Sequence, residues 1–468
     1  MRRPGFIVFT LRPGEALRAV PAHLDLLLGA ALPVSRLDRG PIDRALRPGA
    51  GGFRAVAVFH ARASLARPAE QHVGYDDLEE HLGMSRTYRV RLSDGAASDR
   101  IVDRLRTLGI VESAAVQQLA SAPFGPVLAP PSPTAPGAHE PAGDTGPSPH
   151  DLVDAPQALA IEPGDERVTV ACVDTGVSLG HPELQRRLLA GYDTVDLGLG
   201  AVGKGMRLVG DSRGEDFSPL DAVGHGTHVA SIVGAQGWRM PRGVAGQARI
   251  LPIRVLAAAL AEGGRQPVGV GALPDIDAGI KVAVDLGADV LNMSFGTAAD
   301  KLDPDAPTPH AATVAYAVAR GCVLVAAAGN SGREERFWPA AHPDVIAVGS
   351  VGAGGHRSSF STFGTHVDLA APGERIFSAD RHGYRAPSGT SFAAPFVAGA
   401  AGLLLAADLR ARPATHEAAG PIRARAVRDA LINSTTPLPG GAAELIGTGR
   451  LSISRALSTL HANQAVAT

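Results

Sequence analysis

Cysteine is scarce in this 468-residue sequence, with only Cys172 and Cys322 present. Both lie inside apolar stretches that have the composition of buried strands, where a free cysteine behaves as a small hydrophobic residue. We therefore expect two free thiols and no disulfide framework. So low a cysteine count is compatible with a reducing compartment, although it does not require one.

Aromatic residues and net charge are also low, at 4% and −2. The arginines of residues 1–70 are scattered, and no basic stripe with interleaved aromatics is present, so we expect no nucleic-acid partner. No stretch has the length and character of a membrane span, because the longest apolar run, 392–407, is rich in alanine and glycine. The short apolar run Phe6–Phe9 soon meets Arg12 and does not resemble a signal peptide, which favours a cytoplasmic over a secreted protein.

Length and a hydrophobic content of 45% suit a globular α/β protein with two domains. In residues 1–120 the patterns predict strands at 6–11, 53–60, 88–92 and 111–117, a helix at 98–108 and a weaker helix at 17–28. The resulting order, β-α-β-β-α-β, predicts a small α+β domain with a ferredoxin-like sandwich.

Proline dominates the next zone, residues 121–150, which carries nine prolines between positions 123 and 149. Such a segment cannot bury a core, and we expect an exposed linker that proteases can reach. Residues 151–468 then alternate between apolar strand patterns and helical patterns. This alternation predicts one α/β domain, with a parallel sheet covered by helices on both faces.

Three segments of this larger domain carry groups suited to nucleophilic catalysis. A buried-strand pattern ends at Asp174, a glycine turn containing His225 opens an apolar helix, and Ser391 opens the long apolar run. A serine at the start of a buried helix has its backbone N–H in a region that favours negative charge, which suits the oxyanion of acyl transfer. The three residues together predict an Asp–His–Ser triad.

These motifs resemble those of the subtilisin-like serine protease family over roughly residues 150–461. The matching segments are Asp174-Thr-Gly, Gly224-His-Gly-Thr-His-Val-Ala, Asn292-Met-Ser-Phe-Gly, Ala327-Ala-Gly-Asn330, Ser359-Phe-Ser-Thr-Phe-Gly364 with Val367-Asp-Leu-Ala-Ala-Pro-Gly373, and Ser388-Gly-Thr-Ser-Phe-Ala-Ala-Pro. Asp, His and Ser follow in the chain order of subtilisin. The resemblance implies a serine endopeptidase in which Ser391 is the nucleophile, His225 the general base and acid, and Asp174 the group that orients the imidazole.

The resemblance also implies an oxyanion pocket and a peptide groove. Asn330 would donate its side-chain amide to the oxyanion, with Thr390 supporting that pocket from behind. Extended substrate would pair with one groove segment, and the glycines would leave room for the side chain before the scissile bond. The residues so implied to bind substrate are Ser294, Phe295, Gly296, Ala328, Gly329 and Thr390. Residues 331–339 carry a charged tetrad that lies either at the pocket mouth or on an exposed loop, so specificity is not predicted.

Several polar residues in these segments could have either a structural or a functional role. We expect His228 and Asp221 to support the fold rather than the chemistry. Residues 193–220 form an acidic, glycine-rich insertion whose oxygens suit a structural Ca²⁺, but the spacing fits no calcium loop and a solvated loop is favoured. The chemistry itself requires no cofactor, and no metal ligand is assigned.

The N-terminal zone resembles the prodomain of this family, which implies inhibition of the catalytic domain in cis and autoprocessing in the linker. Two alternatives stay open: a narrow-specificity processing protease that keeps this zone as a recognition domain, and a catalytically silent binding module. A polypeptide is the expected partner in each case. The silent module is disfavoured because no member of the triad is missing.

Overall fold

The computed structural model describes residues 2–17, 20–47, 52–66, 74–93, 98–122, 147–198, 200–202, 205–412, 420–439 and 446–466. Positions 123–146 of the predicted proline-rich linker therefore lie outside the described residues. Within the described residues the chain forms two sheets of seven strands each and two short two-stranded ribbons.

The sheet of the larger domain is parallel throughout, as the sequence predicts. Its strand order is β16 (Leu369–Pro372), β15 (Val345–Val351), β13 (Val323–Ala327), β11 (Val290–Met293), β5 (Thr169–Asp174), β8 (Arg249–Arg254) and β6 (Tyr192–Asp193). These are nearly continuous apolar runs, which is the pattern expected of strands buried on both faces.

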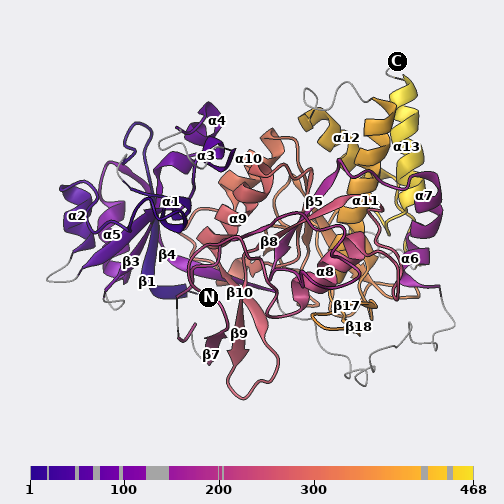
Figure 1. Ribbon diagram of the computed structural model, residues 1–468, viewed down its shortest axis with the longest axis horizontal. Helices are drawn as coiled ribbons and strands as arrows, with labels where there is room; N and C mark the ends of the chain where they lie inside the picture. The colour runs from indigo at the N-terminus through magenta and orange to yellow at the C-terminus, as the bar shows by residue number, and fades with distance from the viewer. Residues whose placement is uncertain are drawn as a thin grey trace.

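Helices cover both faces of this sheet, and the side chains of strand β5 pack against the helices on each face. Val170 and Cys172 point into one hydrophobic cluster, while Ala171 and Val173 point into another, because successive strand residues face opposite ways. The first cluster includes α8 (His225–Gly234), α11 (Thr390–Ala411), α12 (Gly420–Asn433) and α13 (Ile453–Val466), and the second includes α9 (Leu273–Asp285) and α10 (Ala311–Ala319). Figure 1 shows α9 and α10 on one side of β5 and β8, with α11–α13 on the other.

Both cysteines are buried and free, as predicted. Among the described residues one helix, α11, is long and apolar enough to cross a membrane, and its apolar window is wholly buried inside the protein. The short helices α6 (Pro149–Leu152) and α7 (Ala155–Ile161) precede β5; α7 packs on α13, and α6 packs on α7.

The N-terminal residues form an antiparallel sheet in the order β2 (Phe53–Ala57), β3 (Thr87–Leu92), β1 (Arg2–Leu11) and β4 (Val111–Ala122). One face packs on α2 (Pro41–Leu46) and α5 (Ser98–Arg106) through Ile7 and Phe9. The four strands and the helix at 98–108 are confirmed. The expected helix at 17–28 shrinks to α1 (His23–Leu27), and the short helices α2, α3 (Arg62–Ala66) and α4 (Asp77–His81) were not predicted.

Strand β4 joins this N-terminal sheet to the larger domain. Its last residues pair with β10 (Val268–Ala272), which pairs with β9 (Ala257–Ala261) and then β7 (Met206–Val209), so that one sheet runs through both parts of the molecule. In Figure 1 this sheet passes from the N-terminal domain below α9 to the β9–β10 hairpin. The two parts also share a hydrophobic cluster, in which Phe59 and Met84 pack with residues of α9.

Candidate active site

The three predicted triad residues lie at the ends of three buried elements. Asp174 is the last residue of β5, His225 the first of α8, and Ser391 the second of α11. His225 Nδ1 lies 2.7 Å from Asp174 Oδ1, and both side chains are completely buried. Phe392, the neighbour of Ser391, has its ring centroid 5.4 Å from that of His225. The fold thus brings together three residues that are separated by more than 200 positions in the sequence.

The Ser391 hydroxyl donates to the main-chain carbonyl of Ser294 at 3.1 Å. The Ser294 side chain in turn donates to the Ser391 carbonyl at 2.8 Å and accepts from Asn292 Nδ2 at 2.9 Å. Ser294 was predicted from sequence as a groove residue, and its buried hydroxyl additionally braces the backbone of Ser391. Asn292 was not predicted, because its role depends on this tertiary contact.

Asn330 has its side-chain amide held in one orientation. Its Oδ1 accepts from the backbone N–H of Thr390 at 2.9 Å and from the Thr390 hydroxyl at 3.0 Å. This leaves Nδ2 as the outward-facing donor, and a Cβ added to Gly389 would come within 3.3 Å of it. Ser391 follows directly at the N-terminus of the 22-residue helix α11, where the helix dipole and unpaired N–H groups favour an anion. An oxyanion beside Ser391 would therefore meet fixed donors.

Asp221 and His228 have structural partners. The Asp221 carboxylate accepts from the hydroxyls of Thr175 and Thr227 and from the N–H groups of Val223, Gly224 and Thr227, between 2.6 and 3.0 Å. It thereby fixes the turn that presents His225. His228 Nδ1 lies 2.9 Å from Ser378 Oγ, and burial lowers the pKa of the His228 imidazole to about 4. These contacts agree with the predicted structural roles of both residues.

The predicted groove segments lie where the parallel strands end. Phe295 points its ring into the core, 3% exposed, so only its backbone faces the groove, and Ala328 is likewise buried. Strand β4 lies along this segment, since Ser121 and Gly296 exchange backbone hydrogen bonds of 3.3 and 3.2 Å. On the other side, Gly269 to Ala272 pair with Ala122 to Leu119. The end of β4 therefore lies as a strand between Gly296 and β10.

One feature of this groove was not predicted. Gly296 and Gly329 are expected to leave room for a substrate side chain, and the ring of Phe337 lies against both glycines and narrows that room. Phe337 and Trp338 form strand β14 (Phe337–Trp338), which pairs with β12 (Thr297–Ala298) just after Gly296. Residues 331–339 carry no local pattern that predicts this contact, since it depends on the pairing of β14 with β12.

Comparison with known proteins supports the family resemblance that the motifs indicate. Residues 165–449 match the model of the subtilase family. The chain belongs to the subtilase family of subtilisin-like serine proteases. Residues 1–164 lie outside this match.

Several relatives of this subtilase are named proteases. It is 39% identical over 253 residues to the thermophilic serine proteinase of Bacillus sp. (strain AK1), covering 53% of this chain and 54% of the relative. It is 37% identical over 256 residues to thermitase of Thermoactinomyces vulgaris, covering 54% and 79%. The structure of the prenylagaramide maturation protease PagA is 29% identical with a TM-score of 0.49, covering 65% of this chain and 98% of that one. The chain thus spans about half the length of the first relative.

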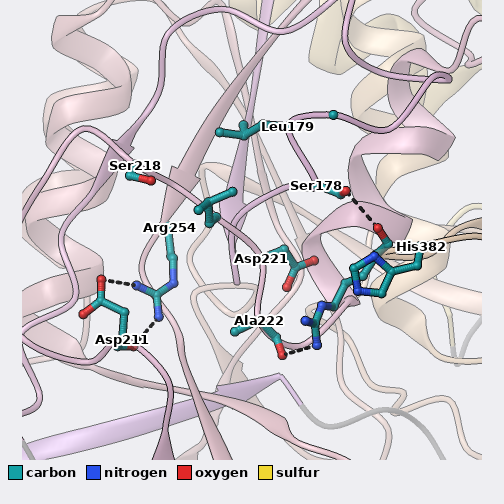
Figure 2. Close-up of a pocket in the computed structure, with 11 residues that line it drawn as sticks. Ser178, Leu179, Asp211, Ser218, Asp221, Ala222, Arg254 and His382 are labelled. Carbon is teal, nitrogen blue, oxygen red and sulfur yellow. Dashed lines mark hydrogen bonds and ion pairs between the residues drawn. The ribbon is translucent and has the colours of Figure 1, made fainter.

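The acidic insertion of this subtilase places three carboxylates together, those of Asp193, Asp211 and Asp216, with ligand atoms within 4.8 Å of one another. The Arg254 guanidinium is buried among them, pairing with Asp193 and donating to the Asp211 carbonyl at 2.6 Å. Figure 2 shows Arg254 beside Asp211, with Asp221 on the far side of the same hollow of about 440 Å³. Because calcium takes six to eight oxygen ligands, and Arg254 already supplies the positive charge here, the cluster fits a calcium ion poorly.

We expect Asp221→Ala to destabilise this subtilase markedly, because five donors on three segments around His225 lose their acceptor. The expected loss is about 3 kcal/mol or more, since each unsatisfied buried donor costs about 1–3 kcal/mol. Thermal unfolding at a fixed scan rate, in a Ser391→Ala background that prevents self-digestion, measures the effect. Asp300→Ala, at an exposed carboxylate, should change little. An unchanged midpoint in Asp221→Ala would contradict the structural role.

Proposed function

We propose that this subtilase is a serine endopeptidase that cleaves peptide bonds through an acyl-enzyme on Ser391. The observation that carries the proposal is the 2.7 Å contact between His225 and Asp174 beside the N-terminus of the helix that bears Ser391. A polypeptide is the substrate. Cytoplasmic location is part of the proposal, since two relatives are named as intracellular serine proteases of Bacillus subtilis (strain 168) and Paenibacillus polymyxa.

In this mechanism Ser391 Oγ attacks the substrate carbonyl carbon while its proton passes to His225 Nε2. Rotation of the serine side chain away from the Ser294 carbonyl frees the hydroxyl for this step. The oxyanion accepts from Asn330 Nδ2 and the Ser391 N–H. The C–N bond then breaks as His225 returns the proton to the leaving nitrogen. Water attacks the acyl ester and gives a proton to His225, which passes it to Ser391 Oγ as the ester C–O bond breaks and the acid is released.

Asp174 serves as a positioning residue in this proposal. With Oδ1 on His225 Nδ1, the tautomer that leaves Nε2 able to accept a proton is favoured, and the carboxylate stabilises the imidazolium that follows. The same Oδ1 accepts from the backbone N–H of Thr175 at 2.7 Å, which fixes the carboxylate on the strand end. Labelling with a serine-reactive phosphonate tests the proposal against a catalytically silent binding module, which would not be labelled.

The N-terminal residues are proposed to form a ferredoxin-like prodomain that inhibits in cis and is cut off in the linker. The support is the strand order β2-β3-β1-β4 with antiparallel pairing, and the position of β4 along the groove. An extended strand of the prodomain there excludes substrate by using the same backbone hydrogen bonds. The alternative, a retained recognition domain, predicts a chain that stays uncut and fully active.

Buried ion pairs join the two domains. Arg89 on β3 donates to Asp275 on α9 at 2.6 Å, with both side chains at most 5% exposed. Glu79 on α4 and Lys281 on α9 pair at 2.6 Å and are equally buried. Burial raises the pKa of Asp275 to about 6, although the Arg89 charge opposes that rise. Removing one partner of either ion pair destabilises the docked state, because the remaining charge stays buried without a partner.

Arg89→Met should therefore loosen the docked prodomain. Removing one partner of a buried charge pair costs about 2–5 kcal/mol, so the dissociation constant of the processed complex should rise about 30-fold or more. Dilution of the processed protein, with peptidase activity as the readout, gives that constant. Arg54→Met, at an exposed arginine on β2, is the matched control. Equal constants for the two variants would argue against inhibition through this interface.

A further inference from the structure

The pocket beside Ser391 has two backbone walls. One is the segment Ser294–Gly296 after β11, and the other is Ala328–Asn330 after β13, its neighbour in the sheet. The resemblance to the family implies that a substrate carbonyl between Ser391 and Asn330 directs the preceding side chain into the space between these walls. Gly296 and Gly329 contribute no side chain there, so whatever else fills this space sets the size of the substrate residue that fits.

The ring of Phe337 fills it. A Cβ built on Gly329 would lie 2.6 Å from Phe337 Cδ2 and 2.7 Å from Cε2, and one built on Gly296 would lie 3.4 Å from Cδ1. Because ordinary carbon contacts are about 3.5–4.0 Å, the ring lies directly against the backbone of both glycines. One aromatic side chain therefore spans the distance between the two walls.

The backbone that carries Phe337 is well fixed. β14 pairs with β12, with Ala298 opposite Phe337, and Ala299 donates to the Arg336 carbonyl at 2.9 Å. On the other side, Ala341 donates to the Phe337 carbonyl at 2.8 Å. The neighbouring Trp338 packs on His342, with ring centroids 4.6 Å apart. These hydrogen bonds fix the backbone at Phe337, so the ring can leave the space between the two glycines only by rotation about its own side-chain torsions.

We propose that Phe337 is a specificity-determining residue that restricts the position before the scissile bond to small side chains: glycine, alanine or serine. The proposal rests on the proposed endopeptidase function and names its substrate class. A leucine or phenylalanine at that position has to displace the ring or leave the carbonyl out of reach of Ser391. Since about 1 Å of misplacement costs on the order of 100-fold in rate, large residues are discriminated against at the chemical step.

The test is a peptide series that varies only the residue before the scissile bond. The processed wild-type protein should cleave after alanine about 100-fold faster in kcat/KM than after phenylalanine or leucine. Phe337→Gly should raise kcat/KM for the large residues by about 100-fold and change the alanine peptide by less than about tenfold. Phe337→Val should give an intermediate profile, and it serves as the second variant if Phe337→Gly folds poorly.

The matched control is Phe217→Gly, because Phe217 is an exposed phenylalanine that packs on Tyr192 in the acidic insertion. Its profile should equal that of the wild type. A wild-type enzyme that cleaves after phenylalanine as fast as after alanine overturns the assignment of Phe337 while leaving the endopeptidase function intact. So does an unchanged profile in both Phe337 variants. A protein that cleaves no peptide and takes no phosphonate label overturns the proposed function as well.

Discussion

Ser391→Ala is expected to lower kcat by about 10⁶ and to leave the chain at full length. Without the hydroxyl, no acyl-enzyme forms and His225 has no nucleophile to activate. His225→Ala should lose a similar factor, and the double variant should be no worse, because the triad acts as one unit. Peptide hydrolysis under saturating substrate measures kcat for all three.

The control for this series is His228→Asn, on the same helix as His225. His228 contacts Ser378 rather than Asp174, so its loss should affect stability and change kcat by less than about tenfold, the equivalent of about 1.4 kcal/mol. If Ser391→Ala retained more than about a tenth of wild-type activity, the assignment of the nucleophile would be wrong. If His228→Asn lost as much as His225→Ala, the general base would have to be reassigned.

Asn330→Ala is expected to cost about 10²–10³ in kcat with little change in KM. The reason is that Asn330 Nδ2 meets negative charge only once the oxyanion forms, so the loss falls on the transition state and not on substrate binding. Thr390→Val removes one of the two groups that hold Asn330 Oδ1, and we expect a smaller loss of the same kind.

Steady-state kinetics on one peptide separates the two parameters. Asn433→Ala, at an exposed asparagine at the end of α12, serves as the control and should match the wild type. A rise in KM with unchanged kcat in Asn330→Ala would instead make Asn330 a contact to the bound substrate before reaction.

The elements that the sequence predicts well are those whose pattern is local and long. The apolar run before Asp174 has the length and composition of a buried strand, and residues 390–411 are mostly apolar, with Asp408 and Arg410 only in the last turn, as suits a core helix. The motif order then assigns Asp174, His225 and Ser391. The 2.7 Å contact between the first two agrees with that assignment.

Features that depend on contacts between distant segments could not be predicted from the sequence. Phe337 follows a charged tetrad and has no pattern of its own, and its place between Gly296 and Gly329 depends on the pairing of β14 with β12. Similarly, Glu79 and Lys281 are 202 positions apart, and only docking of α4 on α9 makes them a buried pair. The short helices of the N-terminal domain are five or six residues long, too short for helical periodicity to be distinguished from a loop.

The central prediction is that the Ser391 hydroxyl is a reactive nucleophile and that the protein uses it to cleave its own chain. Intact mass spectrometry of wild-type protein and Ser391→Ala, each treated with a serine-reactive phosphonate, tests this in one measurement. We predict one label on Ser391 and a chain divided within residues 120–152 for the wild type, with an unlabelled, full-length chain for Ser391→Ala. A wild-type chain without label, or a Ser391→Ala chain that carries the same label and the same cut, would contradict it.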